Sequence, residues 1–493
     1  MKSFGSSQLN MEYFFDEILI EVFRHLSPQM LKSSRLVCKR WDQLIVNNKN
    51  LWKNHQIVFR SKKDFHKFSV IRNMPKDVVM LDDQGFRLEI YEYLHDIHSL
   101  KIDLRPCKAY LDPPYFAKII HSVPHLKILH VSDIIFNEEI QNIKNFQKVK
   151  INLTELQCNS ELVDIFDCTT LKILNVRWHY SLSKQKKKNV CKFISKQNEL
   201  EDLTLNQPND FFEHFKKLKT KQKLKSFTFF SNVNFKDHIA FNKFLEPHKH
   251  SLESLKVQIF SFEQSKTQIE EILKYVMRNL SNLKEFEIDT VFKGIKRKIE
   301  VLPLQLSTFA GKSIERFGFN DIFYAVDDTK QLIDMLPNMK HLSIKSCICK
   351  LVELLDYAAF NPKLESLKVF NFDCVVSAVK FANLKEFSVH TFSQSIQAFC
   401  SFISRNSKTL ERITIGDATN ICLHAVNAIN KCENLKTLTV DVYGNNLSLI
   451  MQTMYEIVLY DKPLTVIFKC YPSTVIFKLP EDKIFWDEQI EMD

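Results

Sequence analysis

Pairs of histidines are the first residues in this chain whose type and spacing could do chemistry, because closely spaced imidazoles can bind a metal ion. His121 and His125 are four residues apart, and His248 and His250 are two apart. Neither pair has an obvious third ligand in the sequence, and a fragment of a motif is a weak signal. We therefore interpret these four as ordinary surface or core histidines, and we predict no metal site.

The cysteines give no stronger sign of a reactive or structural centre. The twelve cysteines are widely spread without a Cys-x-x-Cys pair, whereas a disulfide or zinc framework needs close, paired spacing. Cys347 and Cys349 are the nearest pair, and we expect buried thiols there. The chain also lacks glycine-rich nucleotide loops, His-Glu-x-x-His and Gly-x-Ser-x-Gly. The sequence thus predicts no catalytic residue and no cofactor.

Length and composition limit the possible architectures. A chain of 493 residues is too long for one compact core, so several domains or a repeat array are expected. Seven glycines leave little material for the tight hairpins of an all-β fold. The N-terminus has no signal-like pattern, and there is no stretch of about 18 apolar residues. We expect a soluble intracellular protein, in the cytoplasm, the nucleus or both, with no membrane partner.

A six-residue pattern, apolar-x-x-apolar-x-apolar, dominates the chain. It starts fourteen times between residues 97 and 435, at a mean interval of 26 residues. Clear copies are "LKILHV" (126), "LKILNV" (171), "LEDLTL" (200), "LKSFTF" (224), "LESLKV" (252), "LKEFEI" (283), "MKHLSI" (339), "LESLKV" (364), "LKEFSV" (384), "LERITI" (410) and "LKTLTV" (435). Degenerate copies are "IHSLKI" (97), "FQKVKI" (146) and "IERFGF" (314). Most of residues 97–470 therefore resembles leucine-rich repeats, whose period is roughly 20 to 29 residues.

Each copy predicts one strand, followed by a segment with helical spacing such as residues 269–280. Because side chains alternate along a strand, the fourth and sixth positions should enter the core, and the third, fifth and seventh should face outward. The predicted fold class is α/β, a curved solenoid (horseshoe) with a concave parallel β-sheet and helices outside. The ninth position departs from the family pattern, since it is Asn or Cys only at Asn232 and Cys347. Phenylalanine is expected to fill the interior instead.

The stretch before the repeats, residues 12–52, holds apolar residues at helical spacing and two tryptophans. Asp16 and Glu17 suit the first turn of one helix, Ser27 and Pro28 suit the start of a second, and a third ends at an asparagine-rich turn. Three short helices are predicted. A unit this small cannot enclose all its apolar side chains, so some need a partner, which could be the solenoid, a second copy or a separate protein.

The same stretch, "FDEILIEVFRHLSPQMLKSSRLVCKRWDQLI....LW", resembles the F-box. The resemblance implies binding to a Skp-type adaptor and, through it, to a cullin/RING ligase core. Phe14 and Phe15 stand where the family usually has Leu-Pro, which implies a different entry into the first helix. The adaptor-binding residues are predicted to be Phe14, Phe15, Ile18, Leu19, Val22, Phe23, Leu26, Leu31, Val37, Trp41, Leu44, Leu51 and Trp52.

An F-box followed by leucine-rich repeats resembles the substrate-receptor subunits of SCF-type ubiquitin ligases. The resemblance implies a non-catalytic subunit that holds an unknown protein substrate beside the ligase and so raises its effective concentration. Two alternatives are an F-box scaffold acting without ubiquitin transfer and a leucine-rich-repeat protein whose N-terminal helices only cap the solenoid. The predicted divisions are a tail (1–11), the F-box (12–56), a packed linking and capping segment (57–96), about 14 repeats (97–460) and a C-terminal cap with an acidic tail (461–493).

The net charge of +10 raises the further alternative of a nucleic-acid partner. The predicted concave positions carry nine basic and seven acidic residues, so most of the excess charge lies elsewhere. Lysine runs at 184–192, 216–225 and 293–298 are interpreted as solvated surface. A nucleic-acid partner is therefore disfavoured.

An acidic stripe is the hypothesis for substrate binding. Glu285, Glu287 and Asp289 are successive outward positions of one predicted strand, where like charges repel one another. A solvated stripe, partly neutralised by neighbouring cations, is the alternative. The sharper hypothesis is that the stripe receives a basic segment of the substrate. The residues proposed to bind substrate are Trp178, Phe230, Lys256, Glu285, Glu287, Asp289 and Arg316.

Overall fold

A computed structural model gives the fold. It describes residues 15–26, 28–48, 51, 56–59, 77–80, 97–103, 113–132, 148–178, 183–206, 211–215, 223–234, 238–261, 266–292, 313–320, 333–344, 358–359, 361–372, 379–392, 396–416, 423–442, 464–470 and 473–479. The chain divides into two compact units, each described here by itself. The first unit comprises Met1–Leu205 with Lys217–Gln222, and the second comprises Asn206–Lys216 with Lys223–Asp493.

Three short helices open the first unit, as the sequence predicts: α1 (Asp16–Arg24), α2 (Pro28–Arg35) and α3 (Lys39–Asn47). Asp16 and Glu17 occupy the first turn of α1, where carboxylates offset the positive end of the helix dipole. The Phe23 and Trp41 rings pack edge to face with centroids 5.0 Å apart, which joins α1 to α3. Leu31 and Ile45 are fully buried, so the helices share a small apolar core.

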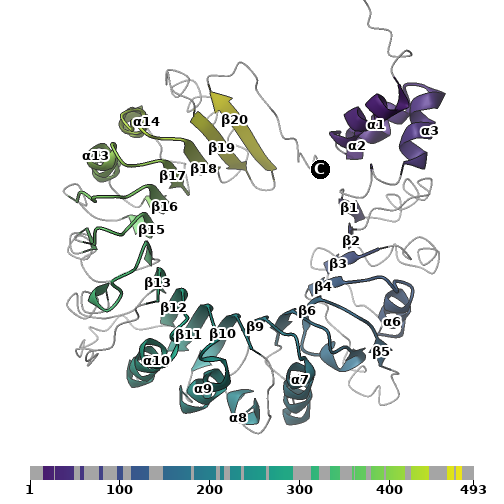
Figure 1. The fold of residues 1–493 in the computed structure, drawn as a ribbon, viewed down its shortest axis with the longest axis horizontal. Helices are drawn as coiled ribbons and strands as arrows, with labels where there is room; N and C mark the ends of the chain where they lie inside the picture. The colour runs from purple at the N-terminus through teal and green to yellow at the C-terminus, as the bar shows by residue number, and fades with distance from the viewer. Residues whose placement is uncertain are drawn as a thin grey trace, which may run out of the picture. The chain divides into compact units, whose positions relative to one another are not determined.

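The rest of the first unit is a parallel sheet. Its strands follow chain order: β1 (Gln56–Phe59), β2 (Asp77–Met80), β3 (Ser99–Asp103), β4 (Ile128–Ser132), β6 (Glu155–Asn159), β8 (Ile173–Arg177) and β9 (Asp202–Asn206). Helix α6 (Pro113–His121), the 3-10 turn η5 (Val163–Ile165) and helix α7 (Lys184–Lys196) connect strands along one face (Figure 1). The strands β1 and β2 extend the sheet into the segment that was expected to link and cap.

The second unit repeats this plan. Its parallel strands are β10 (Ser226–Asn234), β11 (Ser254–Ser261), β12 (Glu285–Phe292), β13 (Arg316–Asn320), β14 (His341–Ile344), β15 (Ser366–Phe372), β16 (Glu386–Phe392), β17 (Arg412–Ile415), β18 (Thr437–Val442) and β19 (Leu464–Cys470). The last strand, β20 (Ser473–Leu479), pairs antiparallel with β19. The helices α8 (Phe211–Phe215), α9 (His238–Leu245), α10 (Lys266–Asn279), α13 (Ile396–Asn406) and α14 (Leu423–Asn430) lie along one face of the sheet (Figure 1). We call the opposite face the open face.

A recurring contact of one backbone carbonyl joins neighbouring strands. The carbonyl of Glu253, at the second pattern position, accepts the N–H groups of both Lys284 (2.8 Å) and Glu285 (3.0 Å). The same pair of hydrogen bonds recurs along both units. For example, the backbone N–H groups of Lys340 and His341 both donate to the carbonyl of Glu315. Both lone pairs of each carbonyl are therefore used, and the strands stay in register. This confirms the predicted α/β leucine-rich-repeat solenoid that follows the N-terminal helices.

The prediction that "FQKVKI" at 146 adds a strand to the main sheet is wrong. Its residues form β5 (Val149–Lys150), which pairs with β7 (Phe166–Asp167) in a separate two-stranded sheet. The strand between β4 and β8 is β6. The carbonyl of Thr154, directly before β6, accepts the pair of hydrogen bonds from the backbone N–H groups of the next repeat. Leu153, Leu156 and Cys158 supply the apolar positions there, so a thiol fills the sixth place.

Phenylalanine fills much of the interior, as expected. Phe286 and Ile288 show the alternation, since these fourth and sixth positions are fully buried. A cluster of seven rings joins α8, β10 and α9, with centroid separations from 4.8 to 6.4 Å. Its members are Phe211, Phe212, Phe215, Phe227, Phe229, Phe241 and Phe244.

Buried amides from the helices tie neighbouring repeats together. Asn406, at the end of α13, accepts a bond from Phe381 N–H (2.8 Å) and donates to the Val379 (3.1 Å) and Phe402 (2.9 Å) carbonyls. Gln197 donates to the Cys168 carbonyl (2.7 Å) and accepts from Leu171 N–H (3.4 Å). These residues at helix C-termini satisfy backbone groups that strands leave unpaired. The ninth-position residues Asn232 and Cys347 have side chains outside the described part of the structure.

Replacing Asn406 by Ala should lower the free energy of unfolding by about 1–3 kcal/mol, because it leaves a buried N–H and a buried carbonyl without partners. Gln397→Ala, an exposed amide on the same helix, is the matched control and should change stability little. Thermal unfolding of the two variants measures the difference. Equal unfolding midpoints would show that the Asn406 amide does not stabilise the repeats.

Candidate functional site

Helix α1 presents apolar side chains on two faces. Leu19 and Phe23 point into the three-helix core and are buried. Phe15, Ile18 and Val22, at intervals of three and four residues, are exposed by 74%, 44% and 51%. A stripe of this spacing lies along one side of a helix, so the second face is available to a partner.

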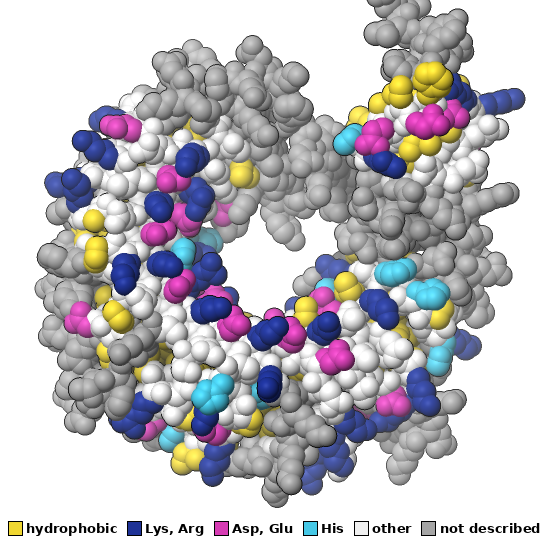
Figure 2. All heavy atoms as spheres, viewed as in Figure 1, with side chains coloured by type: hydrophobic (Ala, Val, Ile, Leu, Met, Phe, Trp, Pro, Cys, Tyr) yellow, Lys and Arg dark blue, Asp and Glu magenta, His cyan; other side chains and the backbone are white. Residues whose placement is uncertain are grey.

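The turn after α2 adds to this exposed apolar surface. Leu36 is 88% exposed and Val37 is 62% exposed, and Met30 on α2 is also exposed. Figure 2 shows hydrophobic side chains on the surface of these helices. The sequence interpretation missed Met30 and Leu36, although the doublet of Leu36 and Val37 directly before Cys38 was a visible signal. Exposed large apolar side chains this close together are typical of a protein-binding surface.

Two arginine–carboxylate contacts hold the helices in position. Nε and Nη2 of Arg40 on α3 both donate to Oδ1 of Asp16 at the start of α1 (2.9 and 2.7 Å). Arg35 at the end of α2 donates to Asp42 on α3 (2.6 Å). The exposed apolar residues therefore lie on a frame set by packing and by charge-assisted hydrogen bonds.

The remaining residues predicted for the adaptor fall into two groups. Leu31 and Leu51 are buried, and Leu26, Trp41 and Leu44 are half-buried, so these support the helical unit from within. Phe14 and Trp52 lie outside the described residues. Direct contact with an adaptor stays a prediction for the exposed set.

A cluster of charges marks the open face of the second unit, as the sequence predicts. Nζ of Lys256 on β11 lies 3.1 Å from Oε1 of Glu285 and 3.9 Å from Oε2 of Glu287 on β12. Ser254 donates a hydrogen bond of 2.7 Å to Glu285. Arg316 on β13 is the register partner of Glu285. The three acids and two cations thus leave a formal charge of −1.

Burial divides the acidic stripe. Asp289 is only 7% exposed, whereas Glu285 and Glu287 are half-buried. The ligand-accessible carboxylates are therefore those of Glu285 and Glu287. Beside Glu287 lies Gly318, where an added Cβ would come within 3.1 Å of the Glu287 Cγ. The small residue leaves the Glu287 side chain room on the open face.

The aromatic residues proposed to flank this stripe lie in different units. Phe230 is half-buried on β10, directly opposite Gln258 of β11, and so belongs to the same open face as the stripe. Trp178 follows β8 in the first unit. Phe230 therefore lies in the same unit as the charged cluster. Trp178 belongs to the other unit, so its part in the same site stays a prediction.

The environment of Glu285 favours its ionised form. Burial acts to raise its pKa, but hydrogen bonds from Ser254 and Lys256 and the positive charges of Lys256 and Arg316 outweigh it. The pKa of Glu285 is accordingly held below its ordinary value. A neighbouring group, His341, has a lowered pKa because of burial and the positive charge of Arg316. The cluster thus combines a stable carboxylate with an imidazole that favours the neutral form.

Alternating charges run along the strand starts of the second unit. The second pattern positions pair as Lys284–Glu253 (2.7 Å), Lys340–Glu315 (3.2 Å), Lys385–Glu365 (3.3 Å) and Lys436–Glu411 (2.7 Å). Figure 2 shows cationic and anionic side chains interleaved beside these strands. We call these residues the edge ladder. The sequence analysis missed it, although Lys and Glu alternate at the second letter of successive repeats.

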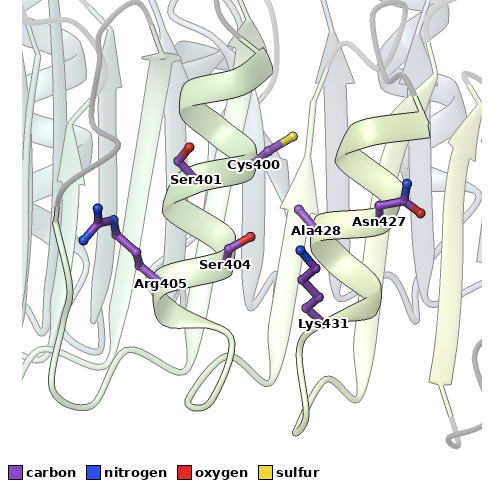
Figure 3. Close-up of a pocket in the computed structure, with 7 residues that line it drawn as sticks. All are labelled: Cys400, Ser401, Ser404, Arg405, Asn427, Ala428 and Lys431. Atoms are coloured by element: carbon purple, nitrogen blue, oxygen red, sulfur yellow. The ribbon is translucent and has the colours of Figure 1, made fainter.

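A groove of about 800 Å³ lies between α13 and α14 (Figure 3). Cys400, Ser404 and Ala428 line it, together with Lys431. Arg405 also borders the groove, and its side chain points away from α14 (Figure 3). Arg405 stands in the last turn of α13 and Lys431 directly follows α14, so both lie at helix C-termini, where cations offset the helix dipole. Their position has a structural explanation, so we assign no ligand to this groove.

The histidine pairs behave as the sequence interpretation expects. His121, His125 and His250 are exposed, whereas His248 is buried and accepts a hydrogen bond from Leu224 N–H (3.4 Å). Among the described residues, no group of three or more His, Cys, Asp or Glu is placed to hold a metal ion.

None of the helices described has the length and apolar composition that a membrane span needs. Cys347 and Cys349 lie outside the described residues.

Comparison with known families identifies the N-terminal unit. Residues 16–57 match the F-box-like family, which spans the three helices. This match and the repeat fold together support an F-box protein with leucine-rich repeats. An F-box domain generally binds Skp-type adaptors and suggests a role as an SCF substrate adaptor, and the repeat fold suggests protein binding. Proteins of this class are generally non-catalytic adaptors.

Two solved structures contain chains that are weakly similar to this one. The mouse RP105/MD-1 complex contains a chain 12% identical to this one, with a TM-score of 0.29, covering 82% of this chain and 85% of that chain. A chain of the Drosophila Toll–Spatzle complex is 9% identical, with a TM-score of 0.28, covering 84% of this chain and 50% of that chain. TM-scores this low do not establish a shared fold. The curated proteins gave no significant match.

Replacing Lys256 by Gln should raise the pKa of Glu285. Burial, which raises this pKa, would remain, whereas the positive charge of Lys256, which lowers it, would be lost. A depressed carboxyl pKa adds stability above its unfolded value, ordinarily 4.5, and that stability disappears as the pH falls through the folded value. The variant should therefore be less stable at pH 7, by up to about 1 kcal/mol, and lose less on acidification. Unfolding midpoints at pH 7 and below pH 4.5 test this. Lys368→Gln, on the open face of β15, is the control, and identical pH profiles for the two variants would contradict the assignment.

Proposed function

We propose that this chain is the substrate-recognition subunit of a Skp/cullin/F-box ubiquitin ligase. The observation that carries the proposal is the F-box-like match at residues 16–57, on helices that expose Phe15, Ile18, Val22 and Leu36. These side chains would bind a Skp-type adaptor, which in turn would connect the chain to a cullin/RING core. Burial of each large apolar side chain contributes roughly 1.5–3 kcal/mol, so a few such contacts are enough for a stable complex.

The repeats would hold the protein to be ubiquitinated. The open face of the second unit offers Glu285 and Glu287 as carboxylates, with Phe230 as an apolar anchor on the same sheet. Basic side chains of the substrate would replace Lys256 as the partners of Glu285 and Glu287. The ring of Phe230 would add an apolar contact. The chain would perform no bond-making step. It would raise the effective concentration of substrate beside the ligase and orient it.

The cytoplasm, the nucleus or both are proposed as the site of action. An F-box scaffold without ubiquitin transfer is the alternative function. Reconstitution with adaptor, cullin/RING core, ubiquitin and a captured partner separates the two. Ubiquitin transfer to the partner supports the receptor function, whereas stable assembly without transfer favours the scaffold.

The double substitution Val22→Glu and Leu36→Glu should weaken binding to a Skp-type adaptor by roughly a hundredfold or more, because it removes two exposed apolar contacts and buries charge. Both positions are exposed, so the fold should be retained. Gln43→Glu with Asn47→Asp adds the same charge at exposed polar positions of α3 and serves as control. Titration of purified adaptor measures the affinities. If the folded Val22/Leu36 variant kept full affinity for the adaptor, the proposal that this face binds the adaptor would be wrong.

Reversal of the stripe by Glu285→Lys and Glu287→Lys should reduce capture of substrate by a chain lacking residues 12–56, which holds substrates without delivering them to the ligase. The loss should be largest at low salt, where charge attraction is least screened. Glu199→Lys with Asp334→Lys, both at exposed positions, reproduces the charge change elsewhere. Quantitative mass spectrometry compares the captured proteins. Identical profiles for the two variants would remove the stripe from the binding site, and this result would not bear on the proposed adaptor site, which the shortened chain lacks.

A further inference from the structure

Helix α7 carries a row of lysines on its solvent side. Lys184, Lys188, Lys192 and Lys196 recur every four residues, and all four side chains are exposed. We call them the lysine row. The opposite side of α7 is buried through Val190, Cys191, Phe193 and Ile194, so the row faces away from the core. Figure 2 shows Lys and Arg side chains gathered where Figure 1 places this helix.

The row has an electrostatic cost within the helix. Like charges four residues apart repel one another, and α7 contains no acidic residue to offset them. The lysines of the first turn also face the positive end of the helix dipole. Other helices pair their cations differently, since Lys274 on α10 contacts Glu271 (2.9 Å) and Arg24 on α1 contacts Glu21. Helix stability therefore gives no reason for the row.

From this arrangement we propose that the lysine row of α7 is a second docking surface, which binds an extended acidic segment of a partner protein. Successive lysines are about 6 Å apart along the helix axis. Residues on one side of an extended strand repeat about every 6.7 Å, so alternate Asp or Glu side chains could meet successive lysines. The surface lies on the helical side of the first unit, and none of its residues belongs to the proposed adaptor or substrate sets.

The chemistry of α7 favours protein over nucleic acid. Its one aromatic residue, Phe193, is buried, so no ring is available to stack on a base. Gln185 donates to Asn189 (3.0 Å), and Asn189 donates to Asp164 (3.1 Å), so these amides are already engaged. The helix has no arginine to bind phosphate in a bidentate manner. A membrane is also disfavoured, because the exposed and half-buried residues of α7 are all polar.

The test measures binding of a fluorescent peptide of alternating glutamate and serine to the full chain. The variant Lys184→Gln, Lys188→Gln, Lys192→Gln and Lys196→Gln should bind on the order of tenfold more weakly than the native chain. The matched control replaces four scattered exposed lysines by Gln: Lys243, Lys380, Lys408 and Lys431. It should keep native affinity. Thermal unfolding should place the midpoint of the row variant at or above the native value, because repulsion is relieved.

Three further measurements can overturn the proposal. Native binding that does not weaken as salt is raised, or an equal loss in the row and control variants, would show that the row is not the site. Tighter binding of a single-stranded oligonucleotide of equal charge would assign the surface to nucleic acid. A gain in peptide affinity on removal of residues 481–493 would identify the chain's own acidic end as the occupant. If the four-residue variant does not fold, Lys188→Gln with Lys192→Gln must still show a specific loss.

Discussion

Within both units, a single carbonyl at the second position of a repeat recurrently accepts two consecutive N–H groups of the next repeat, and the arrangement of the side chains depends on this contact. It sets neighbouring strands in register, as between Glu253 and the pair Lys284 and Glu285. With the register set, the fourth and sixth residues enter the core and the third and fifth reach the open face. The edge ladder follows, because equal positions of successive repeats must then lie side by side.

Strand positions could be predicted because burial of two alternating residues leaves a mark in the sequence, as at Phe286 and Ile288. The strand β6 was not predicted because Cys158 takes its sixth position. Burial raises the pKa of this thiol, so the side chain stays neutral and packs as an apolar residue. The contacts that the amides of Gln197 and Asn406 make with the neighbouring repeat could not be foreseen from spacing, since those backbone partners are more than 20 residues away. Their contacts exist only after neighbouring repeats have packed.

The adaptor surface shows a different limit of sequence reasoning. Ile18 and Leu19 are adjacent and chemically similar, yet one is exposed and the other is buried. In so short a helix both faces are apolar, and only packing against α3 decides which face is internal. Asp289 shows the same limit on the open face, since its outward position was predicted correctly while its burial depends on neighbouring strands. Sequence gives the direction of a side chain more readily than its accessibility.

The distribution of charge links these observations. On the sheet, opposite charges are neighbours: the edge ladder pairs Lys with Glu, and on the open face Lys256 contacts Glu285 while Glu386 contacts Arg412. In the first unit a hydrogen bond of 2.7 Å joins Nε2 of His130 to Oε1 of Glu155 across neighbouring strands. A face neutralised in this manner selects a partner through local pairs and shape more than through long-range attraction. The excess of positive charge must then reside beyond the sheet, and α7, with no acid in its sequence, holds part of it as an ordered row.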